Sequence, residues 1–198
     1  MNIAIIKYNA GNIGSVENAV KRMGFTPIVT DNPDIITASD RVIFPGQGEA
    51  KSTMAYLKVH KLDQVITSLT QPVLGICIGM QLLCKHSEEY DTDCLGIFDV
   101  DVKKFMPEKH QDKVPQMGWN TIGNATSPLF LGFDKPEFVY FIHSFYAPLC
   151  SYTIAQTDYI QPYSSALHKD NFYATQFHPE KSGEVGEKIL RNFIELKG

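Results

Sequence analysis

Apolar residues in the first half of the chain form two kinds of pattern that alternate along the sequence. Short apolar runs predict buried strands over residues 2–8, 26–30, 41–44 and 72–76. Helical spacing of apolar residues predicts helices over residues 15–23, 49–58, 61–69 and 78–85. Because strands alternate with helices through short links, we expect a parallel sheet with helices on its faces.

The second half of the chain has a different pattern, in which short strands follow one another across polar turns. The predicted strands cover residues 97–105, 138–142, 152–156, 164–169 and 172–177. A predicted hairpin turn at Lys169-Asp170-Asn171 makes the last two strands antiparallel. The final helix, over residues 184–196, has an apolar face made of Val185, Ile189, Leu190 and Phe193. No linker or repeat interrupts the pattern, so we expect one α/β domain over residues 1–198, with a mixed, mostly parallel sheet flanked by helices.

Composition narrows the class of protein. The 198 residues are 43% hydrophobic, which is enough for a packed core. The net charge is −4 and Lys and Arg form no run, which argues against nucleic-acid binding through a basic patch. No apolar stretch approaches the roughly 18–20 residues that span a bilayer, and the apolar start is too short for a signal peptide. We therefore expect a soluble, cytoplasmic protein.

One of the four cysteines lies in a pattern typical of a nucleophile. No C-x-x-C pair occurs among Cys77, Cys84, Cys94 and Cys150. Any one of these cysteines could therefore be simply a small buried apolar residue. Cys77 differs because a predicted strand runs into it and a predicted helix follows at once, with Gly75 and Gly79 on either side. This G-x-C-x-G pattern is typical of a nucleophile elbow, in which the side chain is exposed above the sheet. The helix start favours the thiolate, and the N–H of Ile78 can donate to a developing oxyanion.

A nucleophilic cysteine needs a base, and His178 is the best candidate. Pro179 disfavours a helical backbone at His178, and in an extended segment Glu180 lies on the same side as the His178 ring. Glu180 can then fix the tautomer of the ring and stabilise its protonated form. Glu88, Asp112 and Asp170 lie two residues after His86, His110 and His168, but we expect none of these segments to be extended through both positions, and His60 and His143 have no carboxylate at this spacing.

A second donor for an oxyanion is expected from the turn Pro45-Gly46-Gln47-Gly48, which follows the predicted strand 41–44. Glycines let a peptide unit rotate with little steric cost. Pro-Gly alone most often marks a plain turn, but this one lies at the carboxyl end of a strand, where open α/β sheets bind ligands.

Three segments together resemble the class I (triad) glutamine amidotransferases: Pro45-Gly46-x-Gly48, Gly75-Ile76-Cys77-Ile78-Gly79-Met80-Gln81 and Gln176-Phe177-His178-Pro179-Glu180. Within this family, two further segments resemble the glutaminase subunits of imidazole glycerol phosphate synthases: Val114-Pro115-Gln116-Met117-Gly118-Trp119-Asn120 and Tyr140-Phe141-Ile142-His143-Ser144-Phe145. The resemblance covers essentially the whole chain.

The resemblance implies an activity and a set of site residues. Cys77, His178 and Glu180 would hydrolyse glutamine to glutamate and ammonia, without a cofactor or a metal. The backbone of Gln47 and Ile78 would form the oxyanion hole. Contacts to the substrate would come from Gly46, Gly48, Gln81, Glu89, Ser144 and Phe145. Gln81 lies four residues after Cys77, on the same face of the predicted helix, which supports a site role independently.

The resemblance also implies a partner. The ammonia would pass to the HisF cyclase subunit, which converts PRFAR to imidazole glycerol phosphate and AICAR in histidine biosynthesis. The partner-facing positions would be Asn12, Trp119, Tyr140 and Lys181. Each has another interpretation: Trp119 as a core residue, Lys181 as a solvated charge and Asn12 as a helix cap.

The chain departs from the family at Gln47, where relatives commonly carry a small apolar residue between the loop glycines. Members of the family must turn the peptide between positions 46 and 47 to aim its N–H at the oxyanion. Two other functions stay open at this point: a glutaminase that serves a different synthase, and a binding module with an inactive site.

Overall fold

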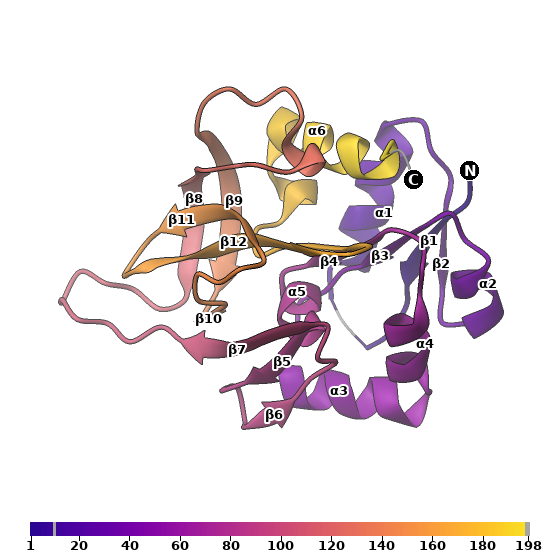
Figure 1. The fold of residues 1–198 in the computed structure, drawn as a ribbon, viewed down its shortest axis with the longest axis horizontal. Coiled ribbons are helices and arrows are strands. Elements are labelled where there is room, and N and C mark those ends of the chain that lie inside the picture. Colours follow the sequence, from indigo (N-terminus) through magenta and orange to yellow (C-terminus); the bar gives the residue numbers. More distant parts are fainter. Residues whose placement is uncertain (10, 197–198) are drawn as a thin grey trace.

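The centre of the fold is a mixed sheet covered by helices on both faces (Figure 1). The computed structural model describes residues 1–9 and 11–196. Within them, a seven-stranded sheet has the order β11-β12-β13-β4-β3-β1-β2. Its strands are β1 (Ile3–Ile6), β2 (Pro27–Thr30), β3 (Arg41–Phe44), β4 (Val73–Ile76), β11 (Thr153–Asp158), β12 (Pro162–Lys169) and β13 (Phe172–Thr175). The first four and β13 run parallel, whereas β12 is antiparallel to both of its neighbours.

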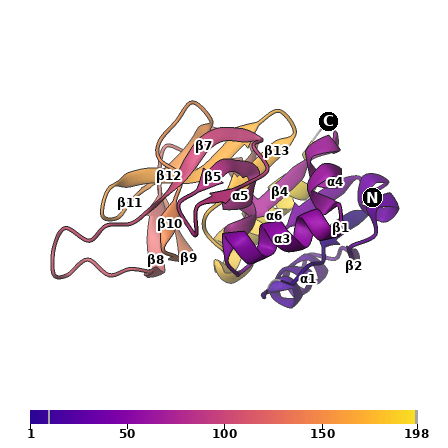
Figure 2. The same cartoon turned by 90° about the horizontal axis from the view of Figure 1, so that it is seen from below.

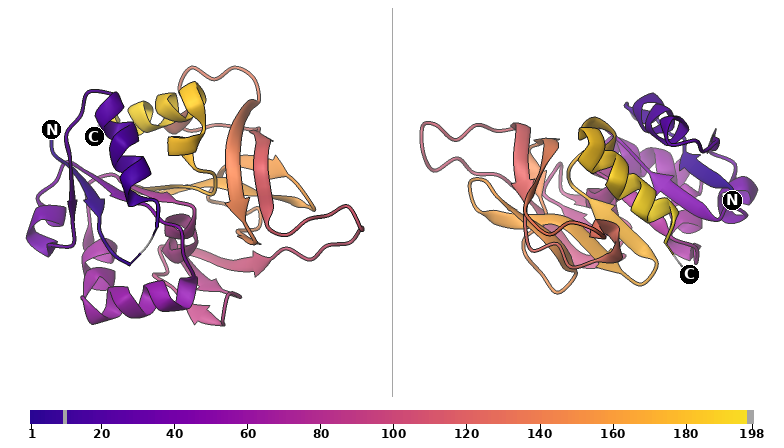
Figure 3. Two further views of the ribbon diagram at one scale, coloured as in Figure 1. Left: turned by 180° about the vertical axis from the view of Figure 1, so that it is seen from behind. Right: turned by 90° about the horizontal axis from the view of Figure 1, so that it is seen from above.

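Helices cover both faces because the strand residues are buried on both sides. In β1, Ile3 and Ile5 pack into one apolar cluster, and Ala4 and Ile6 pack into the other. The first cluster receives α1 (Ile13–Arg22) and α6 (Gly183–Ile194), which lie together on one face of the sheet (Figure 3). The second receives α2 (Pro33–Thr37), α3 (Ala50–Val59), α4 (Leu62–Ser68) and α5 (Ile78–Leu83).

Two smaller sheets are attached to the central one (Figure 2). One has the order β10-β7-β5-β6 and contains β5 (Cys84–Ser87), β6 (Thr92–Asp93), β7 (Phe98–Lys104) and β10 (Phe145–Tyr146). The other pairs β8 (Gln116–Ile122) with β9 (Glu137–His143) in antiparallel register. Short 3₁₀ turns occur at η1 (Pro128–Phe130) and η2 (Pro179–Lys181). The link between β7 and β8 projects beyond the rest of the molecule.

The alternating first half and the antiparallel pairing of β12 with β13 are confirmed. The predicted helix 78–85 is wrong at its end, because Cys84 is extended and starts β5 by pairing with Phe98. Also absent from the sequence prediction were α2, β6, β8 and β10. In the described part of the chain, no helix combines the length and the hydropathy that crossing a bilayer requires.

Candidate active site

Cys77 lies at the sharp turn from β4 into α5. Its backbone has φ 53° and ψ −106°, a region that residues with a side chain rarely adopt. The Cys77 N–H donates to the Thr175 carbonyl at 2.8 Å, which fixes the turn against β13. The sulfur opens onto a cavity, but the residue is only 6% exposed, so it is less exposed than the elbow pattern predicted.

The glycines beside Cys77 are required by close packing of backbone. A Cβ atom at Gly79 would overlap the carbonyl oxygen of Phe44 on β3. A Cβ at Gly75 would lie 2.7 Å from the Leu83 side chain and 3.0 Å from the Gly79 backbone. The absence of these atoms therefore lets α5 approach the sheet closely enough to hold Cys77 at its edge.

His178 follows β13 and is fully buried. Its Nδ1 lies 2.7 Å from Oε1 of Glu180, so the carboxylate fixes the ring orientation. His178 is extended, as Pro179 predicted, but residues 179–181 form a 3₁₀ turn and not an extended segment. This turn brings Glu180 back to the ring. The His178 N–H also donates to the carbonyl of Tyr140 at 2.9 Å, which attaches the segment to β9.

Charges around His178 favour its protonated form. Burial lowers the pKa of the ring, but the negative charge of Cys77, followed by the effect of Glu180, raises it to about 10. The structure therefore brings together the three groups of the predicted triad: a sulfur, an imidazole ring beside it and a carboxylate behind the ring.

Asn12 lies at the start of α1, and its alternative interpretation as a helix cap is wrong. Its backbone has φ 72°, and its side chain does not cap α1. Its amide nitrogen instead donates to Oε1 of Glu180, the same oxygen that contacts His178. This contact joins positions far apart in the sequence, and nothing in the local pattern at Asn12 indicates it.

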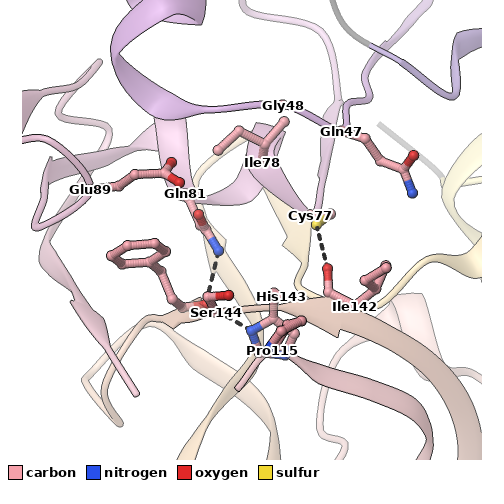
Figure 4. Close-up of a pocket in the computed structure, with 11 residues that line it drawn as sticks. Gln47, Gly48, Cys77, Ile78, Gln81, Glu89, Pro115, Ile142, His143 and Ser144 are labelled. Carbon is pink, nitrogen blue, oxygen red and sulfur yellow. Dashed lines mark hydrogen bonds between the residues drawn. The ribbon is translucent and has the colours of Figure 1, made fainter. Parts of the chain in front are cut away.

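A cavity of about 360 Å³ opens above Cys77 (Figure 4). The predicted site residues that line it are Gln47, Gly48, Cys77, Ile78, Gln81, Glu89, Ser144 and Phe145. Three further lining residues, Pro115, Ile142 and His143, were not predicted as site residues, although they lie inside the motif segments. Gly46, which was predicted, is buried behind the cavity wall.

In this structure, the predicted oxyanion loop does not have its Gln47 N–H free to donate to an oxyanion. The N–H of Gln47 donates to the Gly11 carbonyl at 3.3 Å, and the Gly11 N–H donates back at 3.0 Å. Tyr8, which was not predicted, donates its hydroxyl to the Pro45 carbonyl and lies against Gly46. The Gln47 N–H is therefore occupied by a backbone partner in this structure.

The other wall of the cavity carries the predicted contacts for the amino-acid end of a substrate. The amide nitrogen of Gln81 donates to the Phe145 carbonyl at 2.9 Å. Glu89 accepts the Ala50 N–H at the start of α3 at 2.7 Å, and burial raises the pKa of its carboxyl. The neighbouring Glu88 turns instead to β7, where it pairs with Lys103 at 3.3 Å.

His143 is a buried histidine on the cavity wall. Its Nδ1 lies 2.7 Å from the Phe145 carbonyl, to which it donates, and its Nε2 lies 3.3 Å from the Tyr163 hydroxyl. Burial, first of all, lowers the pKa of the ring to about 4, so the ring is neutral at pH 7. This agrees with treating it as a hydrogen-bonded core group and not as the base.

An apolar surface lies beside the cavity, on the outward side of β8 and β9. Register and alternation place Thr121 and five apolar side chains on it, and we call it the β8–β9 face; the apolar side chains are Met117, Trp119, Phe138, Tyr140 and Ile142. Trp119 is 56% exposed and packs edge-on to Tyr140, with ring centroids 6.0 Å apart. The core interpretation of Trp119 is therefore wrong. Lys181, in η2, is half-buried.

Comparisons with known proteins agree with this geometry. The family model described as glutamine amidotransferase class-I matches residues 4–196. The chain is 63% identical, over 99% of its length and all of the relative's, to imidazole glycerol phosphate synthase subunit HisH of Bacteroides thetaiotaomicron. It is 42% identical to the protein of the same name in Escherichia coli, with the same coverage.

Solved structures show the same fold at low sequence identity. A structure described as a glutamine amidotransferase has a TM-score of 0.74 at 16% identity, and the match covers 97% of each chain. PurLQS from Thermotoga maritima matches with a TM-score of 0.69 at 16% identity, over 98% of this chain and 97% of that one. With a family match over nearly every residue and a sulfur, imidazole and carboxylate gathered at its strand ends, this chain belongs to the class-I glutamine amidotransferases.

Proposed function

We propose that this chain is the glutaminase subunit of an imidazole glycerol phosphate synthase, which supplies ammonia to a HisF cyclase subunit in histidine biosynthesis. The observation that carries the proposal is the position of Cys77, at the floor of a cavity and beside the buried His178–Glu180 pair. The HisF partner converts PRFAR to imidazole glycerol phosphate and AICAR. We further propose that residues 1–198 act as one amidotransferase domain, and that the protein works in the cytoplasm, where this biosynthesis would take place.

The proposed reaction begins with attack of the Cys77 thiolate on the side-chain amide carbon of glutamine. The carbonyl oxygen becomes an oxyanion, and His178, which is protonated, gives its proton to the leaving nitrogen. Ammonia departs and a glutamyl thioester remains on Cys77. His178 then takes a proton from water, which attacks the thioester and releases glutamate. The raised pKa of His178 suits the first of these proton transfers.

Stabilisation of the oxyanion would use the N–H groups of Ile78 and Gln47. The Gln47 N–H now donates to Gly11, so the peptide between positions 46 and 47 must turn before it can serve the reaction. We propose that the isolated chain therefore hydrolyses glutamine slowly, and that the HisF partner with its ligand favours the turned loop. This arrangement would limit the release of ammonia in the absence of an acceptor.

The β8–β9 face is the proposed contact with the partner. Exposed Trp119 and Phe138 give it the aromatic character of a protein interface. Ile142 belongs to this face and also lines the cavity. An ammonia molecule formed at Cys77 would therefore have a short path to the covered surface. We propose Trp119, Tyr140 and Lys181 as contacts, whereas Asn12 has a second candidate role at Glu180.

The proposal is tested by a comparison of two nitrogen sources. In the complex with HisF, Cys77→Ala should abolish synthesis of imidazole glycerol phosphate from glutamine and leave synthesis from added ammonia near the wild-type rate. Cys84→Ala is the matched control, because Cys84 is a buried thiol that does not line the cavity. Glutamine-dependent synthesis by Cys77→Ala would refute the proposed nucleophile.

A further inference from the structure

A series of four contacts, two of them buried and two partly buried, links the cavity wall to the sulfur of Cys77. The Phe145 carbonyl accepts a hydrogen bond from Nδ1 of His143 at 2.7 Å and another from Nε2 of Gln81 at 2.9 Å. The same Gln81 nitrogen donates to Oε1 of Gln176 at 3.0 Å. Nε2 of Gln176 then lies 3.7 Å from the Cys77 sulfur, within the range of an N–H···S hydrogen bond.

The direction of these hydrogen bonds follows from one backbone group. The Phe145 carbonyl can only accept, so the Gln81 atom that faces it must be the amide nitrogen. Because this nitrogen also faces Gln176, Gln176 must present its oxygen there. The amide nitrogen of Gln176 is left to face Cys77. The donor at the sulfur is thus set by the carbonyl at the other end of the series.

Gln176 is fully buried and does not line the cavity, so its amide is shielded from bulk water, whereas Gln81 lines the cavity and is 4% exposed. A buried N–H that points at a sulfur stabilises the negatively charged thiolate more than the neutral thiol. The Ile142 carbonyl, 3.8 Å from the sulfur, has the opposite preference, because it can only accept a hydrogen bond from the thiol. Gln176 therefore opposes the effect of that carbonyl.

The titratable groups around the sulfur are few. His178 is the one that carries positive charge. Tyr8 and Tyr163 also interact with Cys77, and burial raises the pKa of both, so both are neutral at pH 7. His143 is neutral, and Glu180 lies behind His178. Among the neutral groups, the Gln176 amide is the side-chain donor that faces the sulfur.

We propose that Gln176 is a catalytic residue whose amide donates a hydrogen bond to the Cys77 thiolate. Through Gln81 and the Phe145 carbonyl, the same amide fixes the position of Cys77 relative to the cavity wall that carries the predicted substrate contacts. This inference rests on the proposed function, in which Cys77 is the nucleophile. It also gives the first residue of the Gln176-Phe177-His178-Pro179-Glu180 segment a chemical role of its own.

The test is the pH dependence of Cys77 alkylation by iodoacetamide, followed on the Cys77 peptide by mass spectrometry. The experiment uses the whole chain without glutamine or partner. Gln176→Met removes the donor at similar volume and should raise the apparent pKa of Cys77 by about one unit, which is about tenfold less thiolate on the acid side of the transition. Gln176→Glu, which is nearly isosteric, should raise it further because it places a negative oxygen at the sulfur.

Thr175→Val is the matched control. Thr175 is a fully buried neighbour whose hydroxyl donates to the Phe177 carbonyl and not to the sulfur, so its removal should leave the Cys77 pKa unchanged. If the methionine variant does not fold, the glutamate variant provides the same readout. An unchanged pKa in the folded Gln176 variants, or an equal shift in Thr175→Val, would overturn the inference. The proposed function fails by a different result, which is glutamine-dependent synthesis by Cys77→Ala.

Discussion

His178 owes its charge to the sulfur beside it more than to any other favourable contact. The ring is fully buried, and burial by itself would keep it neutral at pH 7. The Cys77 thiolate gives the largest opposing effect, and Glu180 adds to it. Because the pKa in the folded protein, about 10, lies above the usual value of about 6.5, the charged ring stabilises the fold below pH ~6.5. This contribution is lost as the pH rises through 10.

Replacement of Cys77 by alanine should therefore lower the pKa of His178. The substitution removes the negative charge but leaves the ring buried and bonded to Glu180. A titration of the ring nitrogens by NMR measures this pKa directly, and we expect a fall of more than one unit, since the loss of a charged partner shifts a pKa by about that much. The same substitution at Cys84, a buried thiol in the other apolar cluster, should leave the His178 titration unchanged. An unaltered titration in Cys77→Ala would mean that the sulfur does not set the charge of the base.

The sequence predicted the triad because its members lie in local patterns with a chemical reason. The glycines around Cys77 and the proline after His178 constrain the backbone within a few residues. The contacts of Asn12, Tyr8 and Gln176 were not predicted because each joins residues that are far apart in the sequence. Asn12 and Glu180 are 168 positions apart, and Gln176 and Cys77 are 99 positions apart. No local spacing records such pairs; only the folded sheet brings them together.

At the scale of elements, the predictions succeeded where burial on both faces produced a clear apolar run or where helical spacing was long. They failed for α2, which has five residues, and for β6 and β10, which have two each. β8 was missed because its outward residues, such as Met117 and Trp119, are apolar although exposed, so no apolar–polar alternation marks the strand. β5 was assigned to the preceding helix because pairing of Cys84 with β7 overrides the helical pattern.

Close packing of α5 on β3 leads to a prediction about Gly79. Gly79→Ala should destabilise the protein by about 3 kcal/mol or more, since the new methyl group overlaps a backbone carbonyl of Phe44, which cannot move aside like a side chain. Urea unfolding followed by circular dichroism measures the free energy of unfolding.

Gly14→Ala is the matched control for this substitution. Gly14 lies in α1, and a Cβ there would have no atom within 4 Å. We expect it to be neutral or to stabilise by up to about 1 kcal/mol, because alanine is the better helix former. Equal free energies of unfolding for the two variants would refute the packing argument at the elbow.

The whole molecule brings an apolar surface and a reactive sulfur to the same end of the sheet. The His178 N–H donates to the carbonyl of Tyr140, and the Tyr140 N–H donates to the Ser182 hydroxyl at 2.9 Å. The Ser182 hydroxyl itself donates to the His178 carbonyl at 2.7 Å. Strand β9, which contributes to the β8–β9 face, is thus hydrogen-bonded directly to the segment that contains His178. A partner bound to this face would contact a strand that is joined by one hydrogen bond to the backbone of His178.

Trp119→Ala should weaken the complex with HisF at least tenfold in Kd, because exposed tryptophans often supply a large share of interface affinity. Its free energy of unfolding should change little, since the side chain is 56% exposed in the free chain. Isothermal titration with the purified partner measures the affinity. Val59→Ala, at the end of α3 and 78% exposed, should bind normally. Wild-type affinity for Trp119→Ala would place the interface elsewhere.

The most direct test of the account is to identify which thiol reacts with a glutamine-shaped electrophile. A diazoketone analogue of glutamine, added to the complex with HisF and its ligand, should give one adduct per chain, located by peptide mass spectrometry on Cys77. Cys84, Cys94 and Cys150 serve as internal comparisons in the same molecule. Excess glutamine should slow the labelling, and His178→Asn should nearly abolish it. Labelling of another cysteine in preference to Cys77, or none under conditions where glutamine is consumed, would contradict the account.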